Sequence, residues 1–121
     1  MKKRVYDLED RLIDFALVVD EIVEILPNTK LANHIGNQLV RSCTSPALNY
    51  GEAQSAESTK DFIHKFKIIL KELRETRVCL KIIKRKPLVK YEVVDKVIEE
   101  NNELLAIFLK SVETASKNVH R

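Results

Sequence analysis

The side chains in this sequence that resemble a catalytic set lie in one stretch, at spacings of three and four residues. A helix over that stretch would place them along one side: Gln38, Arg41, Ser45, Asn49 and Glu52. A serine, a histidine and a carboxylate are the groups that acyl-transfer enzymes combine as nucleophile, general base and orienting acid. His64, in the next predicted helix, would complete the set. One hypothesis is therefore a hydrolase built on Ser45, Asn49, Glu52 and His64.

A structural role explains the same polar residues without catalysis. No glycine-rich phosphate loop or oxyanion cradle accompanies them. Pro46 interrupts the helical pattern at a cost of about 3 kcal/mol, and Gly51 adds roughly 1 kcal/mol. Asn49 and Glu52 follow one turn later, where their side chains can bond backbone groups near the irregular turn. We therefore predict a structural polar cluster of Arg41, Ser45, Asn49 and Glu52, and no catalytic residue.

The remaining chemistry-bearing residues are scattered. His34, His64 and His120 lack an i,i+4 acidic or histidine partner, so neither a metal nor another cofactor is expected. Cys43 and Cys79 lack the paired spacing of a zinc site, and we interpret them as thiols that pack as small apolar residues.

The composition indicates one helical domain spanning residues 1–121. The 121 residues include only 2 Gly and 3 Pro, and 45% are hydrophobic and 32% charged, as in an all-α protein. The basic start, Met1-Lys2-Lys3-Arg4, leads into no apolar signal core. Because no window approaches the roughly 20 apolar residues of a membrane span, we expect a cytoplasmic protein without a membrane partner.

Apolar residues recur every three or four positions in four segments, which predicts four amphipathic helices. The first helix stops before Pro27, the second is capped by Asn28 or Thr29 and extends towards Ala56, and the fourth follows a short link. The third starts at a capping box, Ser58-Thr59-Lys60-Asp61, and ends in Lys84-Arg85-Lys86-Pro87. The predicted core is Leu8, Leu12, Phe15, Ala16, Val19, Ile22, Val23 and Leu26; Leu31, Ile35, Leu39, Cys43, Ala47 and Tyr50; Phe62, Phe66, Ile69, Leu70, Leu73, Leu80 and Ile83; and Val94, Ile98, Leu105, Phe108, Val112 and Ala115.

Four such helices with short links predict an antiparallel up-down-up-down four-helix bundle, with the second helix kinked near Pro46. An antiparallel second and third helix would place Arg41 opposite residues 72–77 and Glu52 opposite residues 62–65, so we expect charge pairs across these two helices. Some apolar residues fall outside the single stripes, namely Ile63, Ile68, Val78, Cys79, Ile82, Leu104, Ile107 and Leu109. Second apolar faces indicate contacts between subunits, with a wide core stripe as the alternative.

Charge is concentrated in the third helix. Residues 60–90 contain eleven Lys/Arg and three Asp/Glu, a net charge of +8, whereas the rest of the chain carries −5. Lysines, arginines and His64 recur there at steps of four and three, which places them along one side of a helix. The candidate nucleic-acid-binding residues are Lys60, Lys67, Lys71, Arg74, Lys81 and Arg85. A solvated charged face is the alternative. No aromatic residue interleaves this row, which argues against readout of single-stranded bases.

Four parts of the sequence resemble the bacterial 23S rRNA-intervening sequence protein family: residues 38–45, Asn49-Tyr50 with Glu52-Ala53, residues 61–68, and residues 71–76. The resemblance covers essentially the whole chain and extends to the accessory variability determinant of diversity-generating retroelements, which has the same fold. It implies an antiparallel four-helix bundle, and related members assemble as homopentameric rings or barrels. The retroelement relatives are similar to non-enzymatic subunits that bind RNA and reverse transcriptase.

These observations lead to one principal hypothesis and one alternative. The first is a non-enzymatic homo-oligomer, a pentamer by resemblance, whose basic third helix binds RNA or another acidic partner. The alternative is a protein-interaction scaffold without nucleic-acid contact, whose basic row is covered by or paired across subunit contacts.

Overall fold

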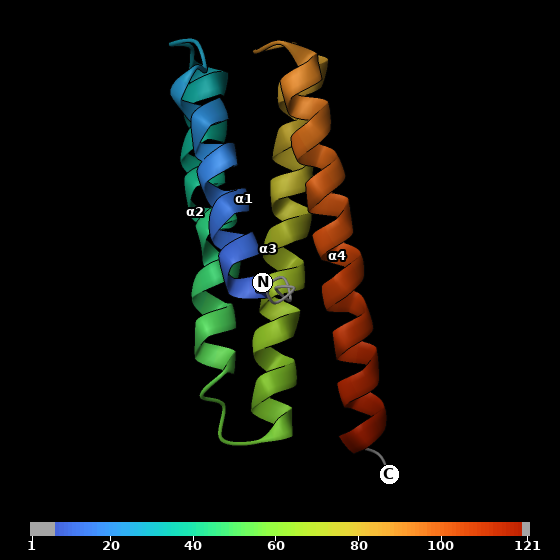
Figure 1. Cartoon of the computed structure of the whole chain (residues 1–121). Helices are drawn as coiled ribbons and strands as arrows, with labels where there is room; N and C mark the ends of the chain where they lie inside the picture. The colour runs from blue at the N-terminus through green and yellow to red at the C-terminus, as the bar shows by residue number, and fades with distance from the viewer. Residues whose placement is uncertain (1–6, 120–121) are drawn as a thin grey trace, which may run out of the picture.

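The computed structural model describes residues 7–119, apart from the side chain of Tyr91 (Figure 1). It contains four helices, α1 (Leu8–Glu24), α2 (Lys30–Ala53), α3 (Thr59–Arg85) and α4 (Tyr91–Val119), and no strand within those residues. The all-α prediction is therefore confirmed. The expectation for the N-terminus and the interpretation of His120 fall on residues outside the described range. None of the helices is apolar over a length that could cross a membrane, as far as residues 7–119 are concerned.

The helices alternate in direction, as predicted for a four-helix bundle. In Figure 1, α1 and α3 run upwards and α2 and α4 run downwards. Each helix packs against its neighbour in sequence, and α1 closes the bundle against α4 through the smallest of the four contacts. In the described part of the chain, α1 and α3 have no close Cα approach, so they are diagonal partners. Their outward faces therefore point away from each other.

Side-chain oxygens cap the first three helices. Asp7, Thr29 and Ser58 accept hydrogen bonds from the backbone N–H groups of Glu9, Ala32 and Asp61, respectively. This selects Thr29 over Asn28 as the cap of α2. Among the described residues, Asp61 makes no return bond to Ser58, so only half of the predicted capping box forms. The carboxylate of aspartate is one methylene shorter than the glutamate that the reciprocal motif prefers.

The core contains most of the predicted stripes and corrects three positions. Leu12, Val19, Leu39, Leu73 and Phe108 are among the side chains fully removed from water. Leu31, predicted in the core, is exposed, and the neighbouring Ala32 takes the buried position in the first turn of α2. Cys79 and Leu104, predicted on second faces, belong to the core. On these two helices, the wide core stripe accounts for part of the excess apolar surface.

α2 continues through Pro46 from Lys30 to Ala53. The missing N–H of Pro46 removes the normal helical bond to the Ser42 carbonyl. The proline ring is buried, and the Asn49 amide donates to the Ser45 carbonyl (3.0 Å) and hydroxyl (2.9 Å) one turn away. Side-chain bonding thus reinforces the turn after the proline, and the kink near Pro46 stays a prediction.

Candidate nucleic-acid interface

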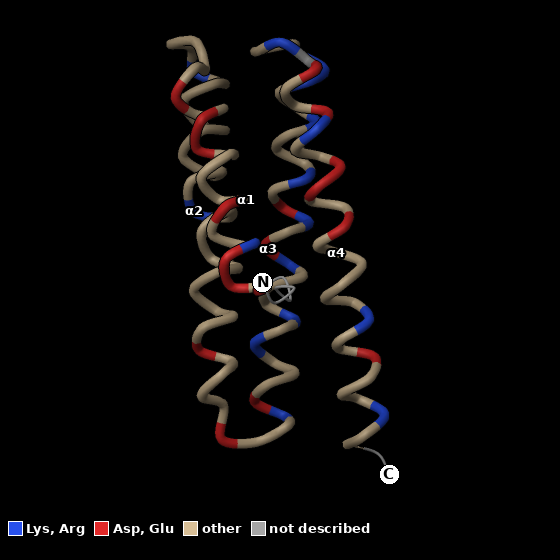
Figure 2. Tube along the Cα trace, in the orientation of Figure 1, with Lys and Arg blue, Asp and Glu red and all other residues tan. Residues whose placement is uncertain are grey.

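The basic row of α3 lies on the outer surface of the bundle. We define the basic stripe as Lys60, His64, Lys67, Lys71, Arg74, Lys81 and Arg85, with Val78 in its one gap; all eight side chains are exposed. The opposite side of α3 packs into the core through residues such as Phe66, Leu73 and Leu80. Figure 2 shows the basic positions recurring along the length of α3. Because α-helices rise by 1.5 Å per residue, the stripe is about 37 Å long.

The lysines of α3 that lie off the stripe are neutralised within the molecule. The Lys65 ammonium is 2.6 Å from a Glu52 carboxylate oxygen, a bond that raises the pKa of Lys65, and Lys84 is 2.7 Å from Asp95. By contrast, the structure assigns no ion-pair partner to any stripe cation within residues 7–119. Intramolecular ion pairs therefore do not neutralise the stripe within the described structure.

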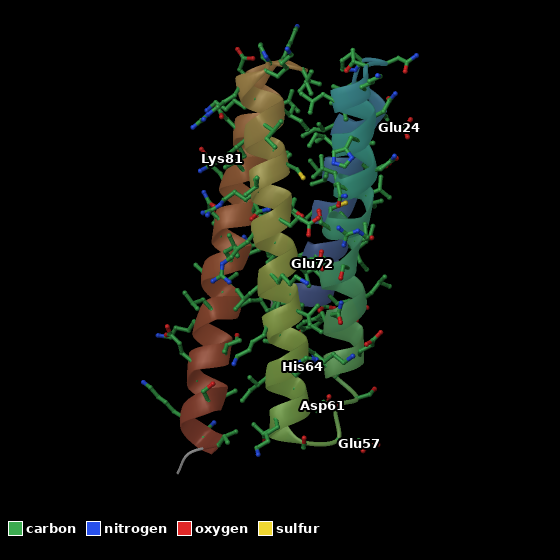
Figure 3. All side chains as sticks on the ribbon, turned by 180° about the vertical axis from the view of Figure 1, so that it is seen from behind. Glu24, Glu57, Asp61, His64, Glu72 and Lys81 are labelled. Atoms are coloured by element: carbon green, nitrogen blue, oxygen red, sulfur yellow. The ribbon has the colours of Figure 1, made fainter. Side chains whose placement is uncertain are left out.

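Two acidic residues of α3 turn away from the stripe towards α2. Arg41 lies 2.6 Å from Glu75 and 3.6 Å from Glu72, and Glu72 is almost fully buried. In Figure 3, Glu72 lies between α3 and α2, whereas Lys81 lies on the side of α3 away from α2. Both carboxylates are thus used in helix packing. The cross-helix pairs predicted for Arg41 and Glu52 are confirmed.

A polar contact in the core accompanies these pairs. The buried Thr76 hydroxyl lies 2.8 Å from the Ser42 hydroxyl and also donates to the Glu72 carbonyl. The Asn101 side chain is fully buried, and neither of its amide atoms has a hydrogen-bond partner in the described structure. Sequence periodicity missed these polar core residues because their types are ordinary on a helix surface.

The structure divides the polar set of α2 and does not assemble a catalytic triad. Ser45 and Asn49 bond to each other, Glu52 bonds to Lys65, and Arg41 bonds to Gln38 and Glu75. His64 is exposed, and no hydrogen bond links it to Ser45 or Glu52 within the part that the structure describes. Over the same residues, no group of three or more His, Cys, Asp or Glu side chains could hold a metal ion.

Both thiols are buried and disfavour the thiolate form. Burial, assisted by the charge of Asp20, raises the pKa of Cys43 to about 11. Burial also raises the pKa of Cys79. At neutral pH these thiols remain protonated and act as packing groups, as predicted.

The family resemblance is confirmed by comparison with known proteins. The family model described as 23S rRNA-intervening sequence protein matches residues 6–110. The chain belongs to this family. A solved structure from Bacteroides thetaiotaomicron, described as a protein with unknown function from the S23 ribosomal protein family, is 27% identical. The alignment covers 88% of this chain and 98% of that chain, with a TM-score of 0.81. No curated protein matches the sequence.

In this member of the 23S rRNA-intervening sequence family, α1 presents an apolar surface that the sequence interpretation did not identify. Leu17 is 58% exposed, and Ile13 and Val18 are each 41% exposed. The signal was present in the sequence, since these residues fall outside the core stripe of the first helix. The same reasoning predicted second apolar faces on the third and fourth helices. There Val78 and Leu109 are exposed, whereas the isoleucines of that set are half-buried, namely Ile63, Ile68, Ile82 and Ile107.

Proposed function

We propose that the protein is a non-enzymatic homo-oligomer that binds RNA or a related polyanion through the basic stripe of α3. The observation that carries this proposal is the contrast between paired and unpaired cations on one helix. Lys65 and Lys84 are paired with carboxylates, whereas the stripe cations face water without an ion-pair partner among the described residues. An unpaired row of positive charge attracts polyanions at long range.

The geometry favours contact with phosphates over contact with bases. The stripe carries cationic side chains along one helix, and its single apolar member is Val78. The main stacking side chains in single-strand binders are Phe, Tyr and Trp, and the stripe contains none of these three. Phosphate contacts position a nucleic acid without reading its sequence, so we expect binding with little sequence preference.

Self-association is the second part of the proposal. It is supported by large apolar side chains that remain exposed on α1, α3 and α4, including Leu17, Val78 and Leu109. The number of copies that the family resemblance implies is five. An assembly would repeat the stripe and multiply weak phosphate contacts into stronger overall binding.

Charge reversal on the stripe tests the polyanion proposal. Fluorescence anisotropy of a labelled RNA duplex, titrated at several salt concentrations, gives the affinity and its salt dependence. We expect Lys60→Glu/Lys67→Glu to weaken binding at least about tenfold and to reduce the slope of log K against log salt by about 2, since each lost phosphate contact removes roughly 0.9.

The matched control reverses two exposed lysines of α4, Lys110→Glu/Lys117→Glu, which changes the net charge equally away from the stripe. We expect this control to bind RNA much more tightly than the stripe variant. Equal losses in the two variants, or no salt-dependent binding by the wild-type protein, would contradict the proposal.

An interaction scaffold without nucleic-acid contact is the alternative. Val78, 53% exposed within the stripe, favours a protein partner over this part of α3 because a phosphate backbone offers it little apolar surface. A scaffold would bind its protein partner undiminished after nuclease treatment.

A further inference from the structure

The outward face of α1 combines acidic and apolar side chains. We define the acidic face as Asp10, Ile13, Asp14, Leu17, Val18 and Glu21, all of them exposed. None of its three carboxylates takes part in an ion pair within the described residues. Between Leu8 and Glu24 there are six Asp/Glu and one Arg, a net charge of −5, and Figure 2 shows these acidic positions along α1. An exposed apolar patch edged by unpaired charge is typical of a protein-binding surface.

The C-terminal half of the basic stripe has the complementary character. Two apolar residues, Val78 and Ile82, and two cations, Lys81 and Arg85, together line a shallow groove of about 220 Å³. α3 contains nine Lys/Arg and three Asp/Glu, a net charge of +6. One molecule thus carries an acidic apolar face with three carboxylates and a basic apolar face whose groove has two cations.

The two faces lie at the same height on opposite sides of the bundle. The Cys43 thiol contacts the Ala16 carbonyl of α1, and the adjacent Ser42 hydroxyl contacts Thr76 of α3. Leu17 and Val78, close in sequence to these contacts, are therefore level with each other. Because α1 and α3 are diagonal, their outward faces point in opposite directions. In Figure 3, Glu24 of α1 and Lys81 of α3 lie on opposite sides of the molecule.

We propose that the acidic face of α1 in one copy binds the C-terminal half of the α3 stripe in a second copy, head to tail. This inference rests on the self-association in the proposed function and specifies its contact. Leu17 and Val78 leave water together, while Glu21 meets Lys81 and Arg85 and Asp14 meets Arg74. A second copy is the favoured occupant because this chain itself carries the charge and apolar surface that each face requires.

A groove next to the acidic face extends the contact. Phe15, Val18 and Val97 line a depression of about 250 Å³ between α1 and α4, together with the charged residues Asp14, Lys96 and Glu100. Its surface is mostly apolar, so it can receive an aliphatic side chain of the second copy. When two different faces of the protein bind each other, the two outer molecules of the assembly each keep one unoccupied face. Further copies can therefore add until the assembly closes into a ring, or they extend it as an open chain.

The contact leaves one end of the stripe free. Pairing Ala16 with Cys43 places the start of α1 beside Gly51, next to Glu52, which bonds to Lys65. Lys60 and His64 lie beyond that height, outside the reach of a neighbouring α1. Assembly and polyanion binding therefore use different parts of α3.

Mixing two interface variants tests this arrangement. Asp14→Lys/Leu17→Lys disables the acidic face and leaves the stripe intact, whereas Val78→Glu/Lys81→Glu disables the stripe half and leaves α1 intact. By multi-angle light scattering, we expect wild-type chains to associate and each variant alone to be monomeric. An equimolar mixture should form a 1:1 dimer and stop there, because only one compatible pair of faces remains. All these positions are exposed, and circular dichroism checks that each variant folds.

The controls separate this inference from the polyanion proposal. Leu48→Lys introduces the same change as Leu17→Lys at an exposed leucine of α2 and should leave association unchanged. Lys60→Glu/His64→Glu, at the two stripe positions beyond the reach of a neighbouring α1, should keep the wild-type mass while weakening RNA binding. A mixture that remains monomeric while the wild type associates would overturn the head-to-tail contact, and a monomeric wild type would overturn self-association itself. RNA binding that is absent from an intact assembly would refute only the polyanion function.

Discussion

The direction in which each cationic side chain leaves α3 determines what it can do. Lys65 points towards α2, where Glu52 neutralises it, and Lys84 points towards Asp95 of α4. Lys67, only two residues from Lys65, points into water. Two lysines of the same intrinsic chemistry therefore have different roles, since an ammonium already paired with a carboxylate attracts a phosphate only weakly.

At the same scale, burial of the Cys43 thiol predicts a loss of stability at high pH. The folded-state pKa is raised from 9.0 to about 11. The thiol's contribution is fully present below pH 9 and is lost as the pH rises towards 11, and a shift of this size corresponds to about 2–3 kcal/mol. We expect Cys43→Ala to be less stable at neutral pH but to lose less stability between pH 9 and 11. Urea unfolding across this range measures both, and an identical pH slope in the two proteins would contradict the prediction.

At the scale of the element, α2 tolerates a proline that its propensity opposes. An interior proline costs about 3 kcal/mol. The buried ring of Pro46 offsets part of this cost by packing, at about 0.8 kcal/mol for each methylene removed from water. The remainder is compensated by the contacts of α2 with both α1 and α3, including the Arg41 and Glu52 ion pairs.

Replacing the proline should therefore stabilise the helix. Pro46→Ala restores the backbone bond to the Ser42 carbonyl and loses about two buried methylenes, so we expect a gain of about 1 kcal/mol in the free energy of unfolding. The urea midpoint measures the change. A loss of stability would mean that the ring packs into a shape that alanine cannot fill. Asn49→Ala, which removes the bonds to Ser45, should instead cost about 1 kcal/mol.

At the scale of the whole molecule, the bundle is held less firmly at its closing seam than elsewhere. α1 is the shortest helix and makes its smallest contact with α4. Arg11 of α1 links the two helices through hydrogen bonds to α4. Its Nε and Nη2 atoms lie 2.7 and 2.8 Å from the two carboxylate oxygens of Glu100, and Nη2 also lies 2.8 Å from a carboxylate oxygen of Glu103. The hydrogen bond to Glu100 is the largest cause of the raised pKa of Arg11, which stays charged at any pH at which the protein folds.

Breaking this tie should loosen α1 before the rest of the bundle. Arg11→Ala removes charge-assisted hydrogen bonds worth about 1.5–3 kcal/mol. Hydrogen exchange should then accelerate in α1 more than in α2, α3 or α4. Arg41→Ala is the control, since it removes an arginine from the more extensive α2–α3 contact. Equal acceleration in all four helices of the Arg11 variant would show that α1 does not open independently.

Most of the fold and part of the candidate site were predictable from local patterns. Proline and capping residues mark the helix ends, and three-and-four spacing identifies core residues such as Leu12, Leu73 and Phe108. The antiparallel register of two helices joined by a short link is enough to place Arg41 near Glu75. The buried positions of Cys79, Leu104 and Asn101 were not predictable, because a stripe's width depends on how many neighbours a helix has.

The sequence alone determined that four helices form and that one side of the third carries a row of cations, because both properties follow from spacing along a single helix. Only the tertiary structure decided which charged side chains form ion pairs within the molecule and which are left to face water. Glu72 and Glu75 could have neutralised the stripe, but packing against α2 directs both towards Arg41. The diagonal placement of α1 and α3 likewise turns two local charge surpluses into opposite faces. Such pairing depends on residues far apart in sequence, and their proximity exists only after the bundle has closed.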